Sequence, residues 1–456
     1  MTQSESSSAA ASAAAVPKKH PRGLYTLFFT EMWERFSYYG MRALLVLYMT
    51  LAVGKGGLGF NTEWAGMVYA VFTLGVYILS IPAGLVADRW LGHWNAVLLG
   101  GFVIASGEFC LAAGGLPFFY TGLVLIMIGT GLLKPNCTLL VGRLYQRDDP
   151  RRDAAFSIYY MGINIGALLA PLACGFLAQN ERFVSFLSSI GLGDANGWHW
   201  AFGLAGVAML LGITQFVLQR HHLVLVAESH ESTAGNTSAG SESFGSGLKG
   251  RLIALGILLM FALLFFATFE QAGSTLTFFA DKRTNCSIGG WAFPSSWFQC
   301  INSGAVIILA PLFSIMWIRL GTRQPSAPVK FALGLFFVGL SMLLLVPASY
   351  IVEAGLKVAP WWLIGTYILQ TIGELCLSPV GLSITSRLAP PRWSGLMMGV
   401  WMACVGLGNF LAGIVASQSD KLRPSVLFML LAAVPCVAGL ILFLLAPKIR
   451  RLSEST

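Results

Sequence analysis

The most constraining feature of this chain is a group of charged residues inside an apolar stretch long enough to cross a bilayer. The stretch contains the sequence EMWERFSYYG from Glu31 to Gly40, with three charges and two tyrosines. A charged side chain at bilayer depth costs roughly 2.5–3.5 kcal/mol on insertion scales. Helical spacing of 100° per residue places five polar side chains within about 100° of arc. They are Glu31, Glu34, Arg35, Tyr38 and Arg42.

Two interpretations of this polar face are open. The charges can be structural ion pairs that hold two helices together. Alternatively they line a water-filled cavity, which is the default interpretation of carboxylates inside a membrane segment. The second interpretation predicts that these groups bind a solute or carry protons.

The composition places the chain among polytopic membrane proteins. Apolar residues make up 56% of the sequence and charged residues only 11%, which does not describe a soluble globular protein. Reading for runs of about 20 apolar residues predicts twelve transmembrane helices. The predicted segments are 24–53, 63–87, 95–114, 117–142, 154–179, 198–219, 250–280, 297–318, 330–351, 361–386, 394–417 and 426–447.

Lys and Arg in the loops predict the orientation. If both termini are cytoplasmic, 19 of the 29 Lys and Arg fall in inside loops, 7 in outside loops and 3 within helices. The positive-inside rule therefore favours both termini inside. The net charge of +9 is then a topology signal rather than an indication of nucleic-acid binding.

A polar stretch divides the chain into two similar halves. We expect a disordered cytoplasmic tail at 1–22, since its first 16 residues are Ser- and Ala-rich and resemble no signal peptide. The Ser/Gly-rich composition of 220–249 predicts a flexible cytoplasmic linker. Two six-helix bundles remain at 23–219 and 250–448, followed by a short cytoplasmic tail at 449–456. The loop sequence GLVADRWLG after the second helix is faintly repeated as IRLG after the eighth, which fits a transporter built from repeats.

The first half contains a further cation at membrane depth. Lys134 lies in GTGLLKPN, where Pro135 should bend the fourth helix and free a backbone carbonyl. The nearest available carboxylates are Glu31 and Glu34, so we predict a cluster of these two residues with Arg35 and Lys134. Glu108 in the third helix has no evident partner in the sequence.

The second half contains carboxylates but no cation at membrane depth. Glu270 and Glu374 must pair across the interface, bind a cationic ligand or be protonated. The cavity is therefore expected to be cationic on one side and anionic on the other. A small zwitterion fits this asymmetry, with its carboxylate toward Arg35 and Lys134 and its amine toward Glu374. Arg42 and Glu270 then form a pair that links the halves.

Two smaller observations leave alternatives open. Tyr160 and Asn164 are four residues apart, so they share a helix face that serves either a cavity or a helix-to-helix hydrogen bond. Cys286 and Cys300 lie in or beside a predicted outer loop, where an oxidising compartment would permit a disulfide. The other six cysteines lie in apolar helices and are read as small core residues.

Seven motifs occur in order across about 390 residues. The motifs are EMWERFSYYG, GTGLLKPN, FSIYYMGINIGA, FEQAGS, WFQCINSG, GELCLSPVGLS and MMGVWMACVGLGNFLAG. Together they resemble the proton-dependent oligopeptide transporters of the major facilitator superfamily. The resemblance implies an all-α major facilitator fold and a proton-coupled importer of di- and tripeptides that works by alternating access. It also implies a protein of the cell inner (plasma) membrane that acts as a monomer, without cofactor, metal or nucleic-acid partner.

The resemblance also implies roles for individual residues. Proton coupling is assigned to Glu31, Glu34, Arg35, Lys134 and Glu270. Peptide binding is assigned to Arg35, Tyr39, Tyr77, Lys134, Tyr160, Asn164, Asn302, Glu374, Ser378 and Trp401. Arg42 and Glu270 resemble a pair whose making and breaking gates the outer entrance.

Three other classes of protein are alternatives to a peptide symporter. A drug or sugar exporter of the same fold would not require a cationic and an anionic wall that face each other. An intramembrane metalloenzyme is disfavoured because all six histidines lie in loops or at helix ends. A solute-sensing receptor would bind peptide without proton-coupled flux.

Overall fold

Long helices account for almost all of the structure. The computed structural model describes residues 19–145, 149, 151–190, 197–223, 247–388 and 394–454. The first half contains α1 (Arg22–Thr50), α2 (Thr62–Ile78), α3 (Ser80–Val86), α4 (His93–Ala113), α5 (Leu116–Arg143), α6 (Arg152–Gln179), α7 (Glu181–Ser189) and α8 (Gly197–Leu218). The second half contains α10 (Gly247–Phe269), α11 (Thr275–Arg283), α12 (Gln299–Leu320), α13 (Ala327–Glu353), α14 (Trp361–Leu388), α15 (Ser394–Ser417) and α16 (Pro424–Glu454).

One small hairpin is the only strand structure within the described residues. Strands β1 (Ser287–Ile288) and β2 (Trp291–Ala292) pair antiparallel in the loop between α11 and α12. Ser287 pairs with Ala292 and Ile288 with Trp291. The all-α prediction is therefore confirmed for the body of the molecule.

Eleven helical segments among the described residues are long and apolar enough to cross a bilayer. The first predicted segment corresponds to α1, whose 29 residues include Glu31, Glu34, Arg35 and Arg42. α1 is therefore long enough to cross a bilayer, but its charges exclude it from these eleven segments. The total of twelve crossings and the cytoplasmic placement of the termini stay predictions.

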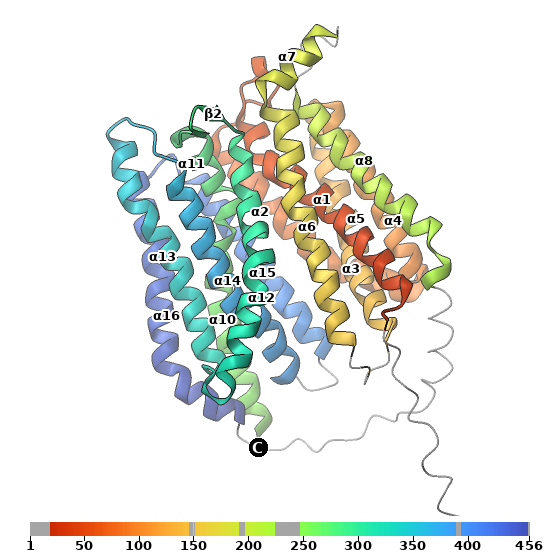
Figure 1. The fold of residues 1–456 in the computed structure, drawn as a ribbon, viewed down its shortest axis with the longest axis vertical. Coiled ribbons are helices and arrows are strands. Elements are labelled where there is room, and N and C mark those ends of the chain that lie inside the picture. The colour runs from red at the N-terminus through yellow and green to blue at the C-terminus, as the bar shows by residue number, and fades with distance from the viewer. Residues whose placement is uncertain are drawn as a thin grey trace, which may run out of the picture.

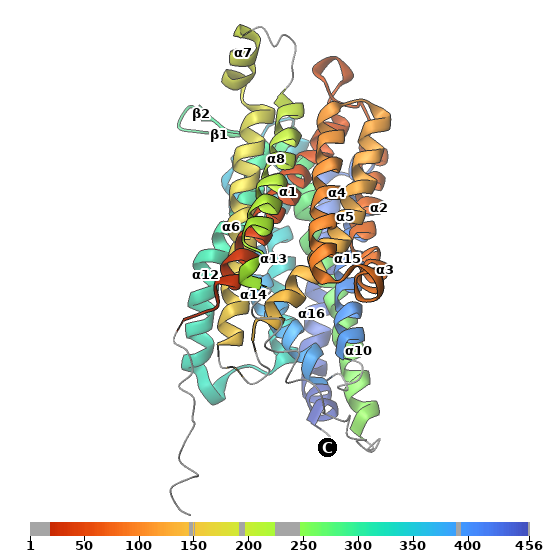
Figure 2. The same cartoon turned by 90° about the vertical axis from the view of Figure 1, so that its right-hand side faces the viewer.

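The helices of each half pack mainly with one another (Figures 1 and 2). In the first half, α4 lies against α5, and α1 lies against α6 and α8. In the second half, α13 lies against α16 and α14, and α10 lies against α15. The most extensive contacts between the halves are those of α2 with α15 and of α6 with α12, and α1 also contacts α11. The side chains on these inward faces therefore lie between the two halves.

Small residues let α2 and α15 approach closely. A Cβ atom placed on Gly66 would lie 2.5 Å from the backbone nitrogen of Ser417. A Cβ on Gly413 would lie 2.5 Å from the Cβ of Ala70. Real Cβ atoms do not approach this closely, so glycine is required at both positions for the observed crossing.

Two predicted segments are interrupted. The segment 63–87 breaks at Leu79 between α2 and α3. Pro82 explains this break, because its ring clashes with the carbonyl four residues earlier and it has no N–H to donate. The segment 250–280 is interrupted by a 3₁₀ turn at Glu270–Gly273, between α10 and α11. Both interruptions lie in helices that face the other half.

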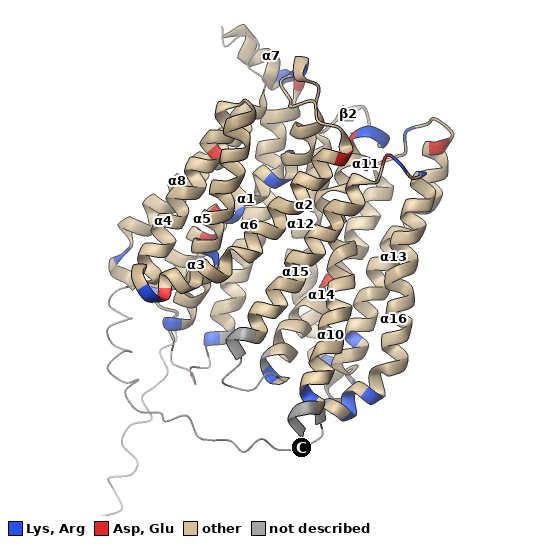
Figure 3. Ribbon diagram, turned by 180° about the vertical axis from the view of Figure 1, so that it is seen from behind, with Lys and Arg blue, Asp and Glu red and all other residues tan. Residues whose placement is uncertain are grey.

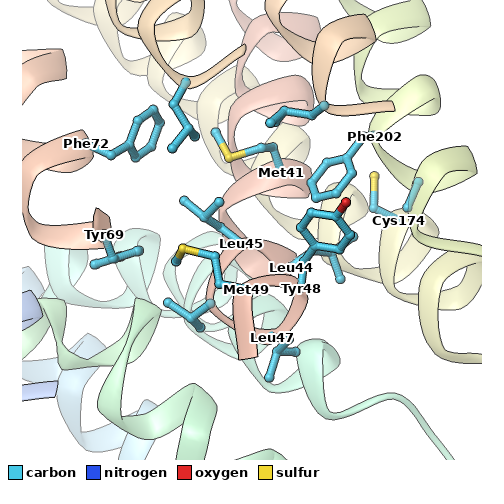
Figure 4. Close-up of a cluster of buried hydrophobic side chains, with 14 of the residues drawn as sticks. Met41, Leu44, Leu45, Leu47, Tyr48, Met49, Tyr69, Phe72, Cys174 and Phe202 are labelled. Carbon is cyan, nitrogen blue, oxygen red and sulfur yellow. The ribbon is translucent and has the colours of Figure 1, made fainter. Parts of the chain in front are cut away.

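The apolar end of α1 anchors this helix in the first half. Met41, Leu44, Leu45 and Tyr48 are fully or almost fully buried. Figure 4 shows them beside side chains from three other helices, including Phe72, Cys174 and Phe202. Burying a side chain of this size contributes roughly 1.5–3 kcal/mol. This packing holds the polar part of α1 in a defined position.

Charged residues are concentrated at the two ends of the molecule (Figure 3). The end that carries the C-terminus shows mostly Lys and Arg, whereas the opposite end shows both signs. The positive-inside rule associates a Lys- and Arg-rich end with the cytoplasm. We therefore refer to the two ends as the predicted cytoplasmic and predicted outer ends.

Some predicted boundaries differ from the structure. α10 begins at Gly247, inside the predicted linker 220–249, and α16 continues to Glu454, through most of the predicted tail 449–456. Residues 1–18 of the predicted tail and 224–246 of the linker lie outside the described residues. The short helix α7 was not expected, because its nine residues fall below the length of a membrane segment.

The cysteines carry no disulfide among the described residues. All eight are free thiols, including Cys286 and Cys300, so the disulfide considered from the sequence is absent from this structure. Partial burial raises the pKa of the Cys286 thiol to about 11, with the nearby Asp281 charge acting in the same direction. Such a thiol is almost entirely protonated near neutral pH and is a poor nucleophile.

Candidate functional site

The charged cluster predicted from the sequence is present in α1. The Arg35 guanidinium lies between the two carboxylates, with Nε 3.2 Å from Glu31 Oε1 and in direct contact with Glu34 Oε2. All three side chains are buried. The hydroxyl of Tyr159 in α6 donates a hydrogen bond of 2.5 Å to Glu31 Oε2. Two carboxylates therefore share one guanidinium, and a phenol supports one of them.

Glycines in α6 allow this cluster to form. A Cβ on Gly162 would lie 2.9 Å from the carbonyl oxygen of Phe28, and one on Gly166 would collide with the carbonyl of Met32. The same Cβ on Gly166 would lie 3.0 Å from the Cβ of Arg35. Because both positions are glycine, the backbone of α6 passes close to the polar part of α1. The motif FSIYYMGINIGA thus contributes both the phenol and the space that the cluster needs.

Lys134 lies near this cluster but does not touch it. Its ammonium is 5.1 Å from the centroid of the Tyr77 ring, within cation–π range. The charges of Arg35, Glu34 and Glu31 act on it electrostatically. Within the described residues, however, it forms no ion pair of 4.0 Å or less. The predicted direct pairing of Lys134 with Glu31 or Glu34 is therefore absent, because its side chain turns toward Tyr77 on α2.

A second ion pair connects the two halves. Arg42 Nη2 contacts Glu270 Oε2, as predicted from the lack of cations in the second half. The guanidinium also donates through Nε to the hydroxyl of Tyr69 at 2.8 Å and through Nη2 to Asn409 Oδ1 at 3.3 Å. α1 and α2 thus meet the 3₁₀ turn and α15 at one guanidinium.

The 3₁₀ turn after α10 gives this pair its geometry. A Cβ on Gly273 would collide with the hydroxyl of Tyr69 and would lie 2.8 Å from Arg42 Nη2. The turn places Glu270 at its start and Gly273 at its end. Glycine at the end leaves space for the guanidinium and the phenol, while the carboxylate reaches the same guanidinium.

The remaining carboxylate of the second half, Glu374, lies in α14 and has no cationic partner among the described residues. Asn302 in α12 donates 3.0 Å hydrogen bonds to Glu374 Oε2 and to the hydroxyl of Thr371. Glu374 and Asn302 are both partly accessible. A carboxylate held by one amide and still reachable is suited to receive an ammonium group.

The other predicted binding residues divide into two groups. The side chains that are at least partly accessible are those of Tyr39, Tyr77, Lys134, Tyr160 and Ser378. Tyr160 is 44% exposed, which fits a side chain that faces a ligand rather than a neighbouring helix.

Asn164 and Trp401 are buried instead. Asn164 donates to the backbone carbonyl of Tyr160 at 2.9 Å, within its own helix. Trp401 packs edge-on against Phe266 and Phe331 and leaves no room for a side chain at Gly381. Their proposed contacts with peptide stay predictions.

The sequence matches a known family over most of its length. Residues 94–237 and 242–429 match the POT family. The chain belongs to the POT family. The peptide transporter YePEPT of Yersinia enterocolitica is 34% identical over 507 aligned positions, with 96% of each chain covered. The di-/tripeptide transporter of Lactococcus lactis subsp. cremoris is 31% identical, with 95% of this chain and 96% of its own covered.

A solved structure agrees with these relatives. The structure of a peptide transporter in complex with alafosfalin superposes with a TM-score of 0.84 at 38% identity, covering 95% of this chain and 96% of that one. The predicted major facilitator fold of the POT transporters is therefore confirmed. Because the family and the relatives are transporters, this POT member is a multi-pass membrane transporter and not an enzyme.

Four residues of this POT transporter were missed by the sequence argument. Tyr69, Asn409 and Gly273 complete the surroundings of Arg42, and Tyr159 supports Glu31. Tyr159 and Asn409 lie inside two of the motifs that carried the resemblance, in FSIYYMGINIGA and MMGVWMACVGLGNFLAG. Tyr69 lies in an apolar segment whose face carries Thr73 but no charged residue, so the argument from charge did not indicate it.

Proposed function

We propose that this transporter is a proton-coupled symporter that imports di- and tripeptides by alternating access. The peptide binds between the two halves, with its carboxylate toward Arg35 and Lys134 and its amine toward Glu374. Residues Tyr39, Tyr77, Tyr160, Asn164, Asn302, Ser378 and Trp401 complete the binding site. The protein acts as a monomer in the inner (plasma) membrane.

The observation that carries this proposal is the unequal distribution of charge between the halves. Arg35 and Lys134 belong to the first half, whereas Glu374 belongs to the second and, within the described residues, accepts a hydrogen bond from the Asn302 amide but has no cationic partner. A zwitterion with separated charges bridges such a pair of walls, and a peptide is a zwitterion whose charges lie on different residues. An uncharged sugar or a cationic drug would leave one wall uncompensated.

The relatives support the same substrate class. YePEPT is named as a peptide transporter, and the Lactococcus lactis relative is named as a di-/tripeptide transporter. We extend this substrate class to the present chain, because the residues that form both walls lie within the aligned region.

The buried α1 cluster supports proton coupling. Glu31 and Glu34 compete for one guanidinium, so a proton that neutralises either carboxylate frees Arg35 for another anion. A peptide carboxylate that approaches Arg35 and Lys134 is that anion. Protonation and peptide binding then favour each other, which is the reciprocity that coupling requires.

The energy of one proton is sufficient for this task. A charge that moves down 100 mV releases roughly 2.3 kcal/mol, and each pH unit adds about 1.4 kcal/mol. One proton per peptide can therefore sustain an accumulation on the order of tenfold to several hundredfold.

Contacts between the halves at the predicted outer end support a gate there. Arg42 and Glu270 form its inner layer. Farther out, Lys421 pairs with Glu63 at 2.8 Å, and Lys282 donates to the hydroxyl of Thr62 at 3.1 Å. We propose that this outer end is closed in the present conformation and that breaking of the Arg42–Glu270 pair opens it.

The test is uptake of labelled dialanine into proteoliposomes under an inward proton gradient. We expect accumulation that a protonophore abolishes, and that unlabelled dipeptides or tripeptides block while free alanine does not. Uptake that ignores the protonophore would contradict the coupling. Absence of uptake in a folded preparation would contradict the substrate assignment and favour a receptor or another solute.

A further inference from the structure

A separate pocket lies in the second half at the predicted cytoplasmic end. It has a volume of about 570 Å³ and lies between α12, α13 and α14. At about 30 Å³ per liquid water, this volume is on the order of twenty waters. Neither Glu374 nor Asn302 lines it, so it is distinct from the site between the halves. Its lining includes Phe313, Ser314, Trp317, Gln324, Lys330 and Arg387.

The pocket is cationic at its rim. The ammonium of Lys330 lies 4.2 Å from the centroid of the Trp317 ring and donates to Gln324 Oε1 at 3.0 Å. Gln324 in turn donates to the backbone carbonyl of Trp317 at 2.5 Å, so the amide and the ammonium are held in place. Arg387 is exposed at the end of α14, and its backbone carbonyl accepts a 2.8 Å hydrogen bond from Arg251.

No carboxylate balances these charges among the described residues. The ion pairs of 4.0 Å or less include neither Lys330 nor Arg387. A cation–π contact and an amide position Lys330 but leave its charge uncompensated. A pocket with two such cations attracts an anion.

The corresponding place in the first half is built differently. The loops GLVADRWLG and IRLG end at Gly92 and Gly321, and both glycines have a positive φ, 72° and 48°. After Gly92, side chains bond to one another, because His93 joins Asn136 at 2.7 Å and Arg143 at 2.9 Å. After Gly321, residues such as Gln324 and Lys330 line the open pocket instead. The two halves therefore differ in structure at this place.

We propose that this pocket binds the phosphate group of an anionic phospholipid from the leaflet at that end of the molecule. The pocket lies where α12 ends at Leu320, α13 begins at Ala327 and α14 ends at Leu388, which is the level of the headgroups. Basic pockets between transmembrane helices on the cytoplasmic side bind anionic headgroups in this way. Arg387 and Lys330 bind the phosphate oxygens, and Gln324 and Ser314 lie beside them as hydrogen-bonding groups.

The apolar part of the lining favours a lipid over a free anion. Phe313 and Trp317 line the same pocket as the two cations, together with Pro325, Pro379 and Ile384. Inorganic phosphate would leave these surfaces in contact with water, whereas the glycerol and the first methylenes of a phospholipid cover them. The proposal is independent of the transported substrate.

Lipid preference measured on the purified transporter tests this proposal. Thermal stability in neutral detergent is measured with added phosphatidylglycerol, phosphatidylcholine or inorganic phosphate. We expect a preference for phosphatidylglycerol of about tenfold to thirtyfold in half-maximal concentration, from two cations near an anionic surface. The double variant Lys330→Gln/Arg387→Gln should lose most of this preference. The control Lys448→Gln/Arg451→Gln removes two exposed cations near the end of α16 and should retain it.

Two results would overturn the proposal. If phosphate alone stabilises the wild type as much as phosphatidylglycerol does, the ligand is a soluble anion. If the pocket variant keeps the full preference, the lipid binds elsewhere.

If the double variant does not fold, protection of a single introduced thiol from alkylation tests the same proposal on an otherwise unchanged protein. Ser314 is exposed and lines the pocket, so Ser314→Cys introduces a thiol there. We expect phosphatidylglycerol to slow its alkylation at least about tenfold, while phosphatidylcholine and phosphate have no effect. The unchanged chain, with its eight native cysteines, is the background control. Equal alkylation rates in all three conditions would contradict the proposal.

Discussion

The two halves of the molecule balance their buried charges in different ways. In the first half, one helix contains both signs, and Arg35 contacts Glu31 and Glu34 within a single turn of α1. In the second half, Glu270 and Glu374 have no cation of their own at membrane depth. Glu270 is balanced by Arg42 from the other half, and Glu374 only by an amide and its neighbours. The carboxylates of α1 therefore have a cation within their own helix, whereas the carboxylates of the second half depend on the first half or on a ligand.

This difference links charge to conformation. An isolated buried carboxylate is unfavourable by several kcal/mol, so each carboxylate of the second half favours the arrangement in which a cation reaches it. In the proposed mechanism, that arrangement is the closed outer end for Glu270 and a bound ammonium group for Glu374. The same electrostatic requirement can thus act first as a gate and then as a receptor for substrate.

The largest effect is expected from removal of Lys134, which forms no ion pair with any residue that the structure describes. Lys134→Ala, or Glu34→Gln in the neighbouring cluster, should abolish gradient-driven accumulation of dialanine while the protein remains folded. The wild type can accumulate on the order of fiftyfold at 100 mV if one proton is coupled. Accumulation in proteoliposomes and peptide counterflow without a gradient are measured side by side. Wild-type accumulation in Lys134→Ala would mean that the coupling cluster is wrongly assigned.

The second effect concerns the pair that joins the halves. Arg42→Ala leaves the Glu270 carboxylate buried without its partner and should cost about 3–5 kcal/mol of stability in the closed state. The double variant Arg42→Met/Glu270→Met removes both charges and should recover most of this loss. Thermal unfolding of the single and double variants gives the coupling energy. Equal destabilisation by both would show that the pair is not the source of the effect.

A smaller effect is expected at the turn that brings the pair together. Gly273→Ala introduces a Cβ that collides with the Tyr69 hydroxyl and should destabilise the protein by roughly 1–3 kcal/mol. Gly256→Ala on α10 is the matched control, because no atom lies within 4 Å of its Cβ. Helix propensity alone should leave that control unchanged or slightly more stable. If both variants unfold at the same temperature, the close approach at Gly273 has no energetic importance.

The smallest effect is expected at the outer surface. Lys421 and Glu63 join α2 to the loop before α16, but their side chains are 55% and 54% exposed. Exposed pairs contribute about 0–1 kcal/mol and are screened by salt. Lys421→Ala should therefore change stability by less than about 1 kcal/mol, and less still at high ionic strength. If Lys421→Ala lost as much stability as Arg42→Ala, the exposed Lys421–Glu63 pair would be as important as the buried Arg42–Glu270 pair for holding the outer end together.

Charge and hydropathy predicted much of this arrangement from the sequence. The apolar runs located the membrane segments, and the lack of cations in the second half predicted the Arg42–Glu270 pair across the interface. Both predictions depend on the high cost of an unpaired charge in an apolar environment. Such a cost leaves few alternatives, so sequence alone was sufficient.

Other features depend on close packing, which the sequence does not display. The 3₁₀ turn at Glu270–Gly273 lies inside the single predicted segment 250–280, and Arg42 and Tyr69 occupy the space beside Gly273. Lys134 was expected to contact a carboxylate, but its long side chain reaches the Tyr77 ring instead. The pocket beside Lys330 requires three helix ends in their final positions. Several geometries satisfy the same sequence pattern, and their free energies differ by only a few kcal/mol. The pattern alone therefore does not select among them.

The central claim is that the peptide amine binds Glu374 and the peptide carboxylate binds Lys134. The most direct test is a thermodynamic cycle in which one terminal charge of the peptide and the matching side-chain charge are removed separately and together. Dialanine and N-acetyl-dialanine are compared as competitors of uptake in the wild type and in Glu374→Gln, and dialanine amide is compared in Lys134→Gln. Loss of the amine charge or of the Glu374 charge should each weaken binding by about 2–5 kcal/mol, and both together should weaken it no further than either alone. Likewise, loss of the peptide carboxylate charge in dialanine amide and loss of the Lys134 charge should together weaken binding no further than either loss alone. Independent, additive losses would contradict the account, because the peptide amine would then bind somewhere other than Glu374.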